Sequence, residues 1–344
     1  MEKMKNVCIV IINWNGLNWL KKTLPIVNKY SNQTKIIVID NNSTDKSKNY
    51  IKRKFKNIDI IELKKNYGYA GAYNKALKKI KTKYVLLLNN DVIVSKNWIN
   101  PLLEFLEKNT DFAVVQPKIL DLNKKTHFEY SGAAGGFIDY FGIPFCRGRI
   151  GSVIEKDNGQ YNSSSAIFWA SGACFLINRQ TFLKVGGFDQ QFYMHHEEID
   201  LCWRIQGVGK KIGYCPDSKV FHYGGGTLSK TSYKKTYYNH RNNLIMLFKN
   251  LPIIDLILIL INRVLIDLLI AINYVIKLKL MSFIMVFLAY LSFLTLIPKY
   301  LFINKKKSEK RKVICKEIHG RYNINIILLA IFKYDTFSKL IKKN

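Results

Sequence analysis

The first hundred residues alternate between short apolar runs and segments with helical spacing. Each apolar run predicts a buried strand, and the runs occupy residues 7–12, 35–40, 58–63 and 84–88. Residues 17–30 and 70–81 have apolar positions at helical spacing, and Ser43 begins a typical helix N-cap sequence. Wholly apolar strands alternating with helices predict an α/β fold with a mostly parallel, doubly wound sheet.

Polar clusters follow three of the predicted strands. They contain Asn13 and Asn15, then Asp40 and Asn42, then Asn89, Asn90 and Asp91. Any one cluster is explained equally well by a turn, because Asn and Asp are common turn residues. Ligands bind beyond the carboxyl ends of the strands in doubly wound sheets, so the three clusters together predict a binding edge.

The middle of the chain is less regular. Residues 123–165 are rich in Gly and Ser, which predicts loops and short strands that contribute to an acceptor site. Residues 169–178 predict another strand, residues 185–189 a turn, and a helix is expected from about Glu197.

The last hundred residues have a different pattern. Residues 280–297 contain no charged side chain and would span ~27 Å as a helix, close to the ~30 Å hydrocarbon core of a bilayer. The polar residues of segment 253–276 cluster on one side of a helix: Asp255, Asn262, Arg263, Asp267 and Asn273. That pattern fits an interfacial helix or a membrane helix with a buried polar stripe. The alternative is a pair of buried helices in a soluble domain.

The charge balance is strongly basic. The chain of 344 residues has 54 Lys and Arg against 24 Asp and Glu, a net charge of +30. This excludes an acidic, solvating chain and favours an anionic partner, although abundant Lys, Ile and Asn also indicate a general compositional bias. The basic residues are spread along the chain, so nucleic acid is not the expected partner.

The basic residues near the C-terminus support a membrane location. Residues 299–344 carry 13 basic and 3 acidic side chains, and basic residues flank membrane helices on the cytosolic side and hold anionic lipids. We therefore expect the α/β domain over residues 1–250 on the cytosolic face, membrane-associated or transmembrane helices over 251–303 with 280–297 as the transmembrane candidate, and a basic cytosolic tail with a short amphipathic helix over 304–344. Six cysteines without a CxxC pair and an N-terminus without a signal peptide agree with a cytosolic compartment.

Two acidic clusters are candidates for chemistry. Asp91 can hold a divalent cation that also binds a diphosphate, although an isolated Asn-Asn-Asp sequence is more simply an Asx turn. Glu197, Glu198 and Asp200 include neighbouring carboxylates that repel each other, which raises a pKa and suits a general base. The alternative for these acids is a helix N-terminus, where they offset the dipole.

Three further segments are weaker candidates. His222 precedes three glycines and is a possible metal ligand, although a lone His is more often structural. Arg241 precedes the apolar helices and is either a diphosphate contact or a surface residue. Residues 66–74 open a helix with two glycines whose backbone N–H groups suit a phosphate, but they do not form a GxGxxG motif.

In order and spacing, these segments resemble family 2 inverting glycosyltransferases, in particular their rhamnosyltransferase-like branch. The resemblance covers about residues 6–250 and rests on VCIVIINWNG, IIVIDNNSTD, NYGYAGAYN, YVLLLNNDV, ASGACFLINR, VGGFD, HHEEIDLCWR and VFHYGGGT. It implies a GT-A fold, a nucleoside-diphosphate sugar donor and Mg²⁺ or Mn²⁺.

The resemblance also implies roles for individual residues. Residues implied to bind the nucleotide sugar are Asn13, Asn15, Asp40, Asn42, Asn66, Gly71, Asn74, Asn89, Asn90 and Arg241. Asp91 stands at the metal-binding acid of the family's DxD motif, and His222 matches a histidine that joins the metal site. Glu198 matches the second acid of the family's ED pair and is the expected base, with Glu197 and Asp200 beside it.

The sequence departs from the family pattern at two positions. Asn89 replaces the first Asp of DxD, so metal binding rests on Asp91, the diphosphate and His222. The base is Glu198 rather than Asp. The expected acceptor is a lipid-linked glycan, while the sugar, the nucleotide base and the linkage stay open. The competing hypothesis is a membrane-tethered nucleotide-sugar binder without catalytic activity.

Overall fold

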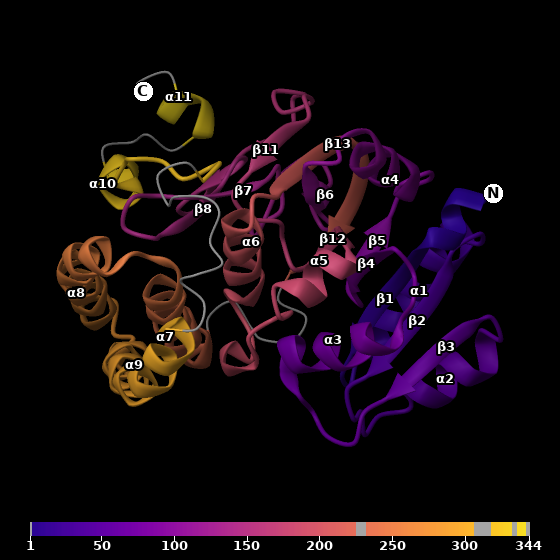
Figure 1. Cartoon of the computed structure of the whole chain (residues 1–344), viewed down its shortest axis with the longest axis horizontal. Helices are drawn as coiled ribbons and strands as arrows, with labels where there is room; N and C mark the ends of the chain where they lie inside the picture. Colours follow the sequence, from indigo (N-terminus) through magenta and orange to yellow (C-terminus); the bar gives the residue numbers. More distant parts are fainter. Residues whose placement is uncertain (1, 225–231, 306–317, 332–335, 342–344) are drawn as a thin grey trace.

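The computed structural model describes residues 2–224, 232–305, 318–331 and 336–341. One nine-stranded sheet forms its centre, in the order β11-β13-β6-β12-β4-β1-β2-β3 with β5 beside β13 (Figure 1). Its strands are β1 (Val7–Asn13), β2 (Lys35–Asp40), β3 (Ile58–Glu62), β4 (Tyr84–Asn89), β5 (Val92–Val94), β6 (Phe112–Asp121), β11 (Ser165–Ile167), β12 (Cys174–Asn178) and β13 (Lys211–His222).

The predicted strands of the N-terminal half are confirmed, but the sheet is mixed rather than mostly parallel. β3, β2, β1 and β4 are parallel, as are β6 and β13. β12 runs antiparallel to both β4 and β6 and joins these two halves, while β5 and β11 run antiparallel to β13. An apolar run predicts burial but carries no information on strand direction, which is why the sequence missed the antiparallel strands.

Helices cover both faces of this sheet, as the doubly wound pattern predicts. On one face α1 (Leu17–Tyr30), α2 (Ser47–Lys54) and α4 (Ile99–Lys108) pack on alternate strand residues such as Ile9 and Val38. On the other face α3 (Gly68–Lys79), α6 (Glu197–Gly207) and α7 (Tyr233–Asn250) pack on the intervening residues such as Val10 and Ile39. A short helix, α5 (Arg179–Lys184), follows β12.

A small second sheet and the C-terminal segments cover the β11 side of the molecule. The sheet contains β7 (Gly136–Ile138), β8 (Pro144–Cys146), β9 (Arg149–Ile150) and β10 (Val153–Ile154), which confirms the predicted short strands. Short helices α10 (Ile326–Ile331) and α11 (Phe337–Ile341) lie near it. Tyr322 N–H donates to Ile138 O, and the Phe337 ring lies 4.8 Å from that of Phe137. The described part of the tail therefore packs on the α/β domain through its second sheet.

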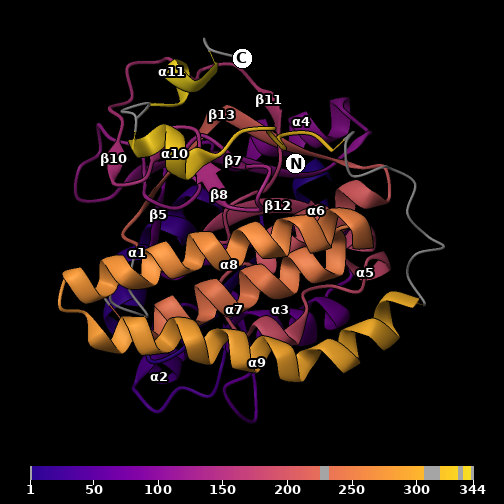
Figure 2. The ribbon, with the colours of Figure 1, turned by 90° about the vertical axis from the view of Figure 1, so that its left-hand side faces the viewer.

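Three long helices form a layer along one side of the protein. Figure 2 shows α7, α8 (Ile253–Ile276) and α9 (Leu280–Lys305) running alongside one another. Leu280–Leu301 is long and apolar enough to cross a membrane, and only 22% of its most apolar stretch is buried inside the protein. Most of this helix surface is therefore turned away from the protein core.

Helix α8 has its polarity reversed relative to a helix of a soluble protein. Its inward face contains Arg263 and Asp267, which are 5% and 1% exposed. Most of its outward residues are aliphatic, and Ile254 and Leu269 are 72% and 68% exposed. The predicted polar stripe is split, because Asn262 and Asn273 lie on the exposed side. Soluble monomers rarely expose apolar patches this large, so the outer face of α8 and α9 is a candidate membrane contact.

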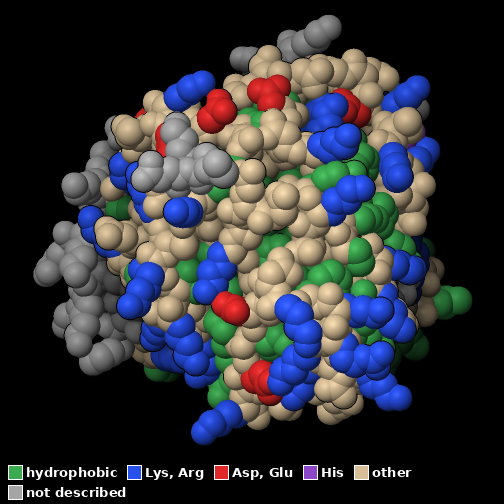
Figure 3. Space-filling view, turned by 90° about the vertical axis from the view of Figure 1, so that its right-hand side faces the viewer, with side chains coloured by type: hydrophobic (Ala, Val, Ile, Leu, Met, Phe, Trp, Pro, Cys, Tyr) green, Lys and Arg blue, Asp and Glu red, His purple; other side chains and the backbone are tan. Residues whose placement is uncertain are grey.

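Basic side chains also cover the opposite end of the molecule. Figure 3 shows Lys and Arg spread among polar and apolar residues over the face that includes the N-terminal strands and helices. The predicted basic run at residues 305–312 lies almost entirely outside the described residues. The visible positive charge is therefore not gathered into a single stripe.

Candidate active site

A cavity of about 700 Å³ opens where the strands of the main sheet end, a size typical of small-molecule sites. It brings together four of the predicted elements, because Asn66, Asn89, Asp91, Glu198 and His222 all line it. Asn90 and Glu197 line the same cavity. Residues far apart in the sequence thus meet at one binding edge.

Asp91 and His222 meet through strand pairing. β13 pairs antiparallel with β5 so that His222 stands opposite Val92, and its Nε2 lies 3.1 Å from Asp91 Oδ1. The other ring nitrogen, Nδ1, lies 3.4 Å from Glu129 Oε1. Burial disfavours a charged imidazole, but the two carboxylates outweigh it and raise the pKa of His222 to about 10. In the absence of a metal ion the two carboxylates therefore favour the protonated imidazole, which must lose a proton before it can ligate a metal.

The chemistry of this cluster fits a divalent cation. Carboxylate oxygens with one imidazole form a donor set that suits Mg²⁺ or Mn²⁺, and Asp91 and His222 are both buried at the cavity wall. No three His, Cys, Asp or Glu side chains of the described residues form a ready-made metal cage. A cation here would therefore take its remaining ligands from a bound diphosphate.

Glu197 and Glu198 begin helix α6 at the cavity. The loop that precedes them contains three non-glycine residues with positive φ, namely Tyr193, His195 and His196, a conformation that costs energy and often marks a functional site. Tyr193 O accepts a hydrogen bond from Tyr69 N–H. This contact fixes the loop against helix α3.

Burial gives Glu198 the properties of a general base. Desolvation raises its pKa to about 7, and desolvation together with the charge of Glu198 raises the pKa of Glu197 as well. Glu198 Oε2 has no hydrogen-bond partner among the described residues, and its carboxyl carbon lies beside Gly172. A carboxylate with a pKa near neutrality and an unoccupied oxygen is suited to accept a proton.

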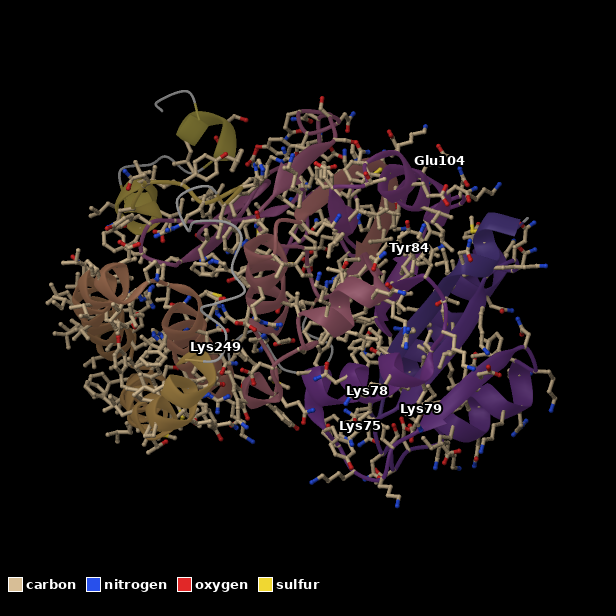
Figure 4. The ribbon with its side chains drawn as sticks, viewed as in Figure 1. Lys75, Lys78, Lys79, Tyr84, Glu104 and Lys249 are labelled. Carbon is tan, nitrogen blue, oxygen red and sulfur yellow. The ribbon has the colours of Figure 1, made fainter. Side chains whose placement is uncertain are left out.

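Asp200 does not line the cavity and has a structural role instead of the predicted catalytic one. It is fully buried, and its Oδ2 lies 2.8 Å from Arg204 Nη2 and 2.9 Å from Lys249 Nζ. Burial would raise its pKa, but these two cations hold it well below its usual range. Lys249, labelled in Figure 4, extends from α7 and also pairs with Asp189 at 2.7 Å. Asp200 therefore joins α6 to α7.

Several predicted nucleotide-site residues support the edge of the cavity. Asn90 Nδ2 donates to Asn13 Oδ1 at 2.9 Å, although Asn13 itself does not line the cavity. A Cβ at Gly16 would stand 2.1 Å from Asn90 Nδ2, so a glycine is needed there. Asn66 Oδ1 accepts from Asn41 Nδ2 at 2.9 Å. This network connects the ends of β1, β2 and β4.

The structure places the other predicted nucleotide-binding residues outside the cavity lining, and they are Asn15, Asp40, Asn42, Gly71, Asn74 and Arg241. Asn15 binds backbone N–H groups of the turn at residues 44–45. Asn74 bonds both backbone groups of Phe188. A Cβ at Gly71 would lie 2.8 Å from Tyr67 Cβ.

Three of the residues predicted to bind the nucleotide sugar lie in different surroundings, and they are Asp40, Asn42 and Arg241. Asp40 is buried, and its Oδ1 has no hydrogen-bond partner among the described residues, so it retains acceptor capacity. Asn42 is exposed, whereas its neighbour Asn41 lines the cavity. Arg241 Nη2 donates to Gln191 O at 2.6 Å. This places Arg241 against the loop that contains Tyr193, outside the cavity lining.

The cavity also contains residues that the sequence did not single out. Glu129, Tyr69 and Trp14 line it near the predicted residues, and Arg263, His240 and Ile270 line it on the side of α7 and α8. Glu129 lies in the irregular region of residues 123–165, where no sequence pattern predicts a functional site. Arg263 appeared only as part of the polar stripe of α8. That buried stripe was the single sequence signal pointing to this side of the cavity.

The mixed α/β sheet, with an acid-histidine cluster and buried carboxylates at its binding edge, agrees with a GT-A-like glycosyltransferase that uses a nucleotide sugar. Residues 8–186, just over half of the chain, match the model of glycosyl transferase family 2. The chain therefore belongs to that family, whose members invert the configuration of the transferred sugar. The resemblance seen in the sequence is confirmed.

The relatives of this chain include rhamnosyltransferases. It is 28% identical over 224 residues to rhamnosyltransferase WbbL of Escherichia coli, covering 63% of this chain and 83% of that protein. It is 23% identical over 227 residues to N-acetylglucosaminyl-diphospho-decaprenol L-rhamnosyltransferase of Mycobacterium tuberculosis, covering 62% and 74%. The names of its relatives thus describe the transfer of rhamnose or of another hexose.

Solved structures support the fold. GalNAc-T7 with UDP, GalNAc and Mn²⁺ aligns with a TM-score of 0.55 at 18% identity, over 72% of this chain and 48% of that chain. The mannosyltransferase PcManGT from Pyrobaculum calidifontis with GDP-Man and Mn²⁺ aligns with a TM-score of 0.50 at 11% identity, over 70% and 63%. The chain therefore spans about half to two thirds of the solved structures it matches.

Proposed function

We propose that this protein transfers rhamnose or a related hexose from a nucleoside-diphosphate sugar to a hydroxyl of a lipid-linked glycan at the membrane. The observation that carries the proposal is the convergence of Glu198, Asp91 and His222 on one cavity. The printed activities of the rhamnosyltransferase relatives support the sugar, and the decaprenol-linked substrate in one of their names supports the acceptor.

Glu198 is the base in the proposed reaction. Its free oxygen accepts the proton of the acceptor hydroxyl as that oxygen attacks the anomeric carbon of the donor. The bond from the anomeric carbon to the diphosphate breaks on the opposite face, which inverts configuration. A divalent cation held by Asp91 and His222 would offset the negative charge of the leaving diphosphate. The His222 imidazole would bind the cation in its neutral form, because a protonated imidazole has no lone pair for a metal.

The proposed membrane contact is a helix layer lying flat on one leaflet. Tyr300, near the end of α9, donates a hydrogen bond to Asp189 of the catalytic domain at 3.0 Å. In the middle of α9, Tyr290 bonds Asp267 at 2.7 Å, and Phe293 packs on Phe248 of α7. An α9 that crossed the bilayer would carry Asp189 into hydrocarbon, which is unfavourable for a charged group. Lying in the plane keeps every one of these contacts and buries the exposed aliphatic face.

The cytosolic leaflet is the proposed side of attachment. The excess of basic over acidic residues after position 299 favours an anionic surface, and the described part of this tail packs on the catalytic domain. The basic residues and the catalytic cavity would therefore lie on the same side of the membrane.

The test is donor turnover by the purified full-length protein in detergent. UDP-, dTDP- and GDP-sugars would be compared with and without Mn²⁺, together with the Glu198→Gln and Asp91→Ala variants. The proposal expects metal-dependent turnover of one donor that is lost in both variants. Failure to bind any donor would refute it, as would turnover that persists in Glu198→Gln.

A further inference from the structure

The cavity has a second end, formed by the membrane-facing helices, which the transfer chemistry does not use. Arg263 of α8 and His240 and Asn243 of α7 line it, together with Ile270 of α8. Ile326 and Ile327 of α10 complete this wall. One cavity thus connects the catalytic acids with a group of cationic, amide and aliphatic side chains.

Arg263 is buried with part of its guanidinium unpaired. The residue is 5% exposed, and its Nη2 donates to Asp267 Oδ1 at 2.8 Å. Its Nε has no hydrogen-bond partner among the described residues. Asp267 is shared with other groups, because it also lies 3.2 Å from His240 Nδ1 and accepts a hydrogen bond from Tyr290. A buried guanidinium with unused N–H capacity beside a cavity is a site for a further anion.

The neighbouring side chains differ in what they offer a ligand. Asn243 is 3% exposed and donates to Gly142 O through Nδ2, while its Oδ1 has no partner in the described part of the chain and suits a hydroxyl donor rather than an anion. His196 is buried, and burial, followed by the electrostatic effect of His195, Arg263 and His240, lowers its pKa to about 3. The carboxylate Asp139 lies on the same side, but its oxygens accept from the backbone N–H groups of Ile143 and Ile326. The open polar capacity at this end therefore includes the guanidinium Nε.

The aliphatic side of this end leads to the membrane-facing surface. Ile270 lines the cavity, whereas the preceding residue of α8, Leu269, is 68% exposed on the outer face. Ile326 and Ile327 approach from α10. A ligand chain that left the cavity beside Ile270 would thus lie next to the exposed aliphatic residues of α8.

We propose that this end of the cavity binds the acceptor through its phosphate, with Arg263 as the anchoring cation and with Ile270, Ile326 and Ile327 around an aliphatic chain attached to that phosphate. This proposal rests on the proposed transferase function and specifies its acceptor as a polyprenyl phosphate or diphosphate sugar. The donor diphosphate lies at the Asp91 end, so the two anionic groups occupy opposite ends of one cavity.

The experiment compares two acceptors that carry the same sugar, one linked to polyprenyl diphosphate and one to an uncharged alkyl chain. In Arg263→Gln we expect the KM for the phosphorylated acceptor to rise at least tenfold, while the KM for the alkyl glycoside and for the donor stays within about twofold. Arg263→Lys should recover part of the loss, because it keeps the charge but not the fork. Asn262→Ala, at the adjacent exposed position of α8, is the matched control.

Competition on the unmodified protein tests the same site independently of folding. Polyprenyl phosphate should inhibit competitively against the phosphorylated acceptor, and inorganic phosphate at the same concentration should not. Equal inhibition by both would refute the aliphatic exit, and equal KM changes for both acceptors in Arg263→Gln would refute the phosphate site. Absence of donor turnover in the unmodified protein would instead refute the proposed function, so the two failures are distinguishable.

Discussion

The raised pKa of Glu198 allows a quantitative prediction of how the rate of sugar transfer depends on pH. Burial raises this pKa to about 7, and a base acts only when it is deprotonated. Activity should therefore be lost as the pH falls through 7. With a single pKa near 7, the ionised fraction is about 9% at pH 6 and about 91% at pH 8, so kcat/KM should rise about tenfold between them.

The assay is donor consumption at saturating Mn²⁺ between pH 5.5 and 9, with stability checked at each pH. Glu198→Gln should lower kcat by about 10²–10⁴-fold and remove this pH limb, without weakening nucleotide binding. Glu104→Gln is the control, because Glu104 lies on the surface of α4 (Figure 4). A flat profile from pH 6 to 8, or Glu198→Gln activity within tenfold of the unmodified protein, would show that Glu198 is not the base.

The remaining predictions concern the metal, the buried ion pairs and the membrane. Asp91→Ala should reduce turnover at least about a hundredfold, and chelation should silence the unmodified protein until Mn²⁺ is restored; full activity in chelator would contradict a metal at Asp91. Asp200→Asn should destabilise the protein by about 3–5 kcal/mol, because Lys249 loses one of two buried carboxylate partners; an unchanged melting temperature would argue against this role. Leu265→Glu with Leu269→Glu should lower binding to anionic vesicles at least tenfold, measured by sedimentation, whereas undiminished binding would exclude the α8 face as the contact.

The sequence located the polar clusters at the strand ends but not which side chain of each cluster faces the cavity. Asn41 and Asn42 both follow the end of β2, and Asn42 has a positive φ of 65°. Buried Asn41 lines the cavity, whereas Asn42, which was predicted, is exposed. The acids of α6 are separated by helix geometry. Positions 198 and 200 differ by about 200° around α6, so Glu198 faces the cavity while Asp200 faces α7.

Glu129 shows the limit of reading motifs along the chain. It reaches His222 because β6 and β13 pair in parallel and the chain after β6 folds back beside them. Neither the sequence nor the composition of this loop predicts the contact between Glu129 and His222. The direction of β12 is a similar case, since its apolar residues satisfy burial in either orientation.

Ion pairs and a hydrogen bond join α6, α7 and α9, and they also fix how far the active site lies from the outer helices. Lys249 bridges Asp189 and Asp200, and Tyr300 of α9 bonds the same Asp189. The helix whose first turn contains Glu198 is therefore joined directly to the layer proposed to rest on lipid. Under that proposal the base has a constant height above the bilayer. The enzyme would then select acceptors by the distance between their reactive hydroxyl and the lipid.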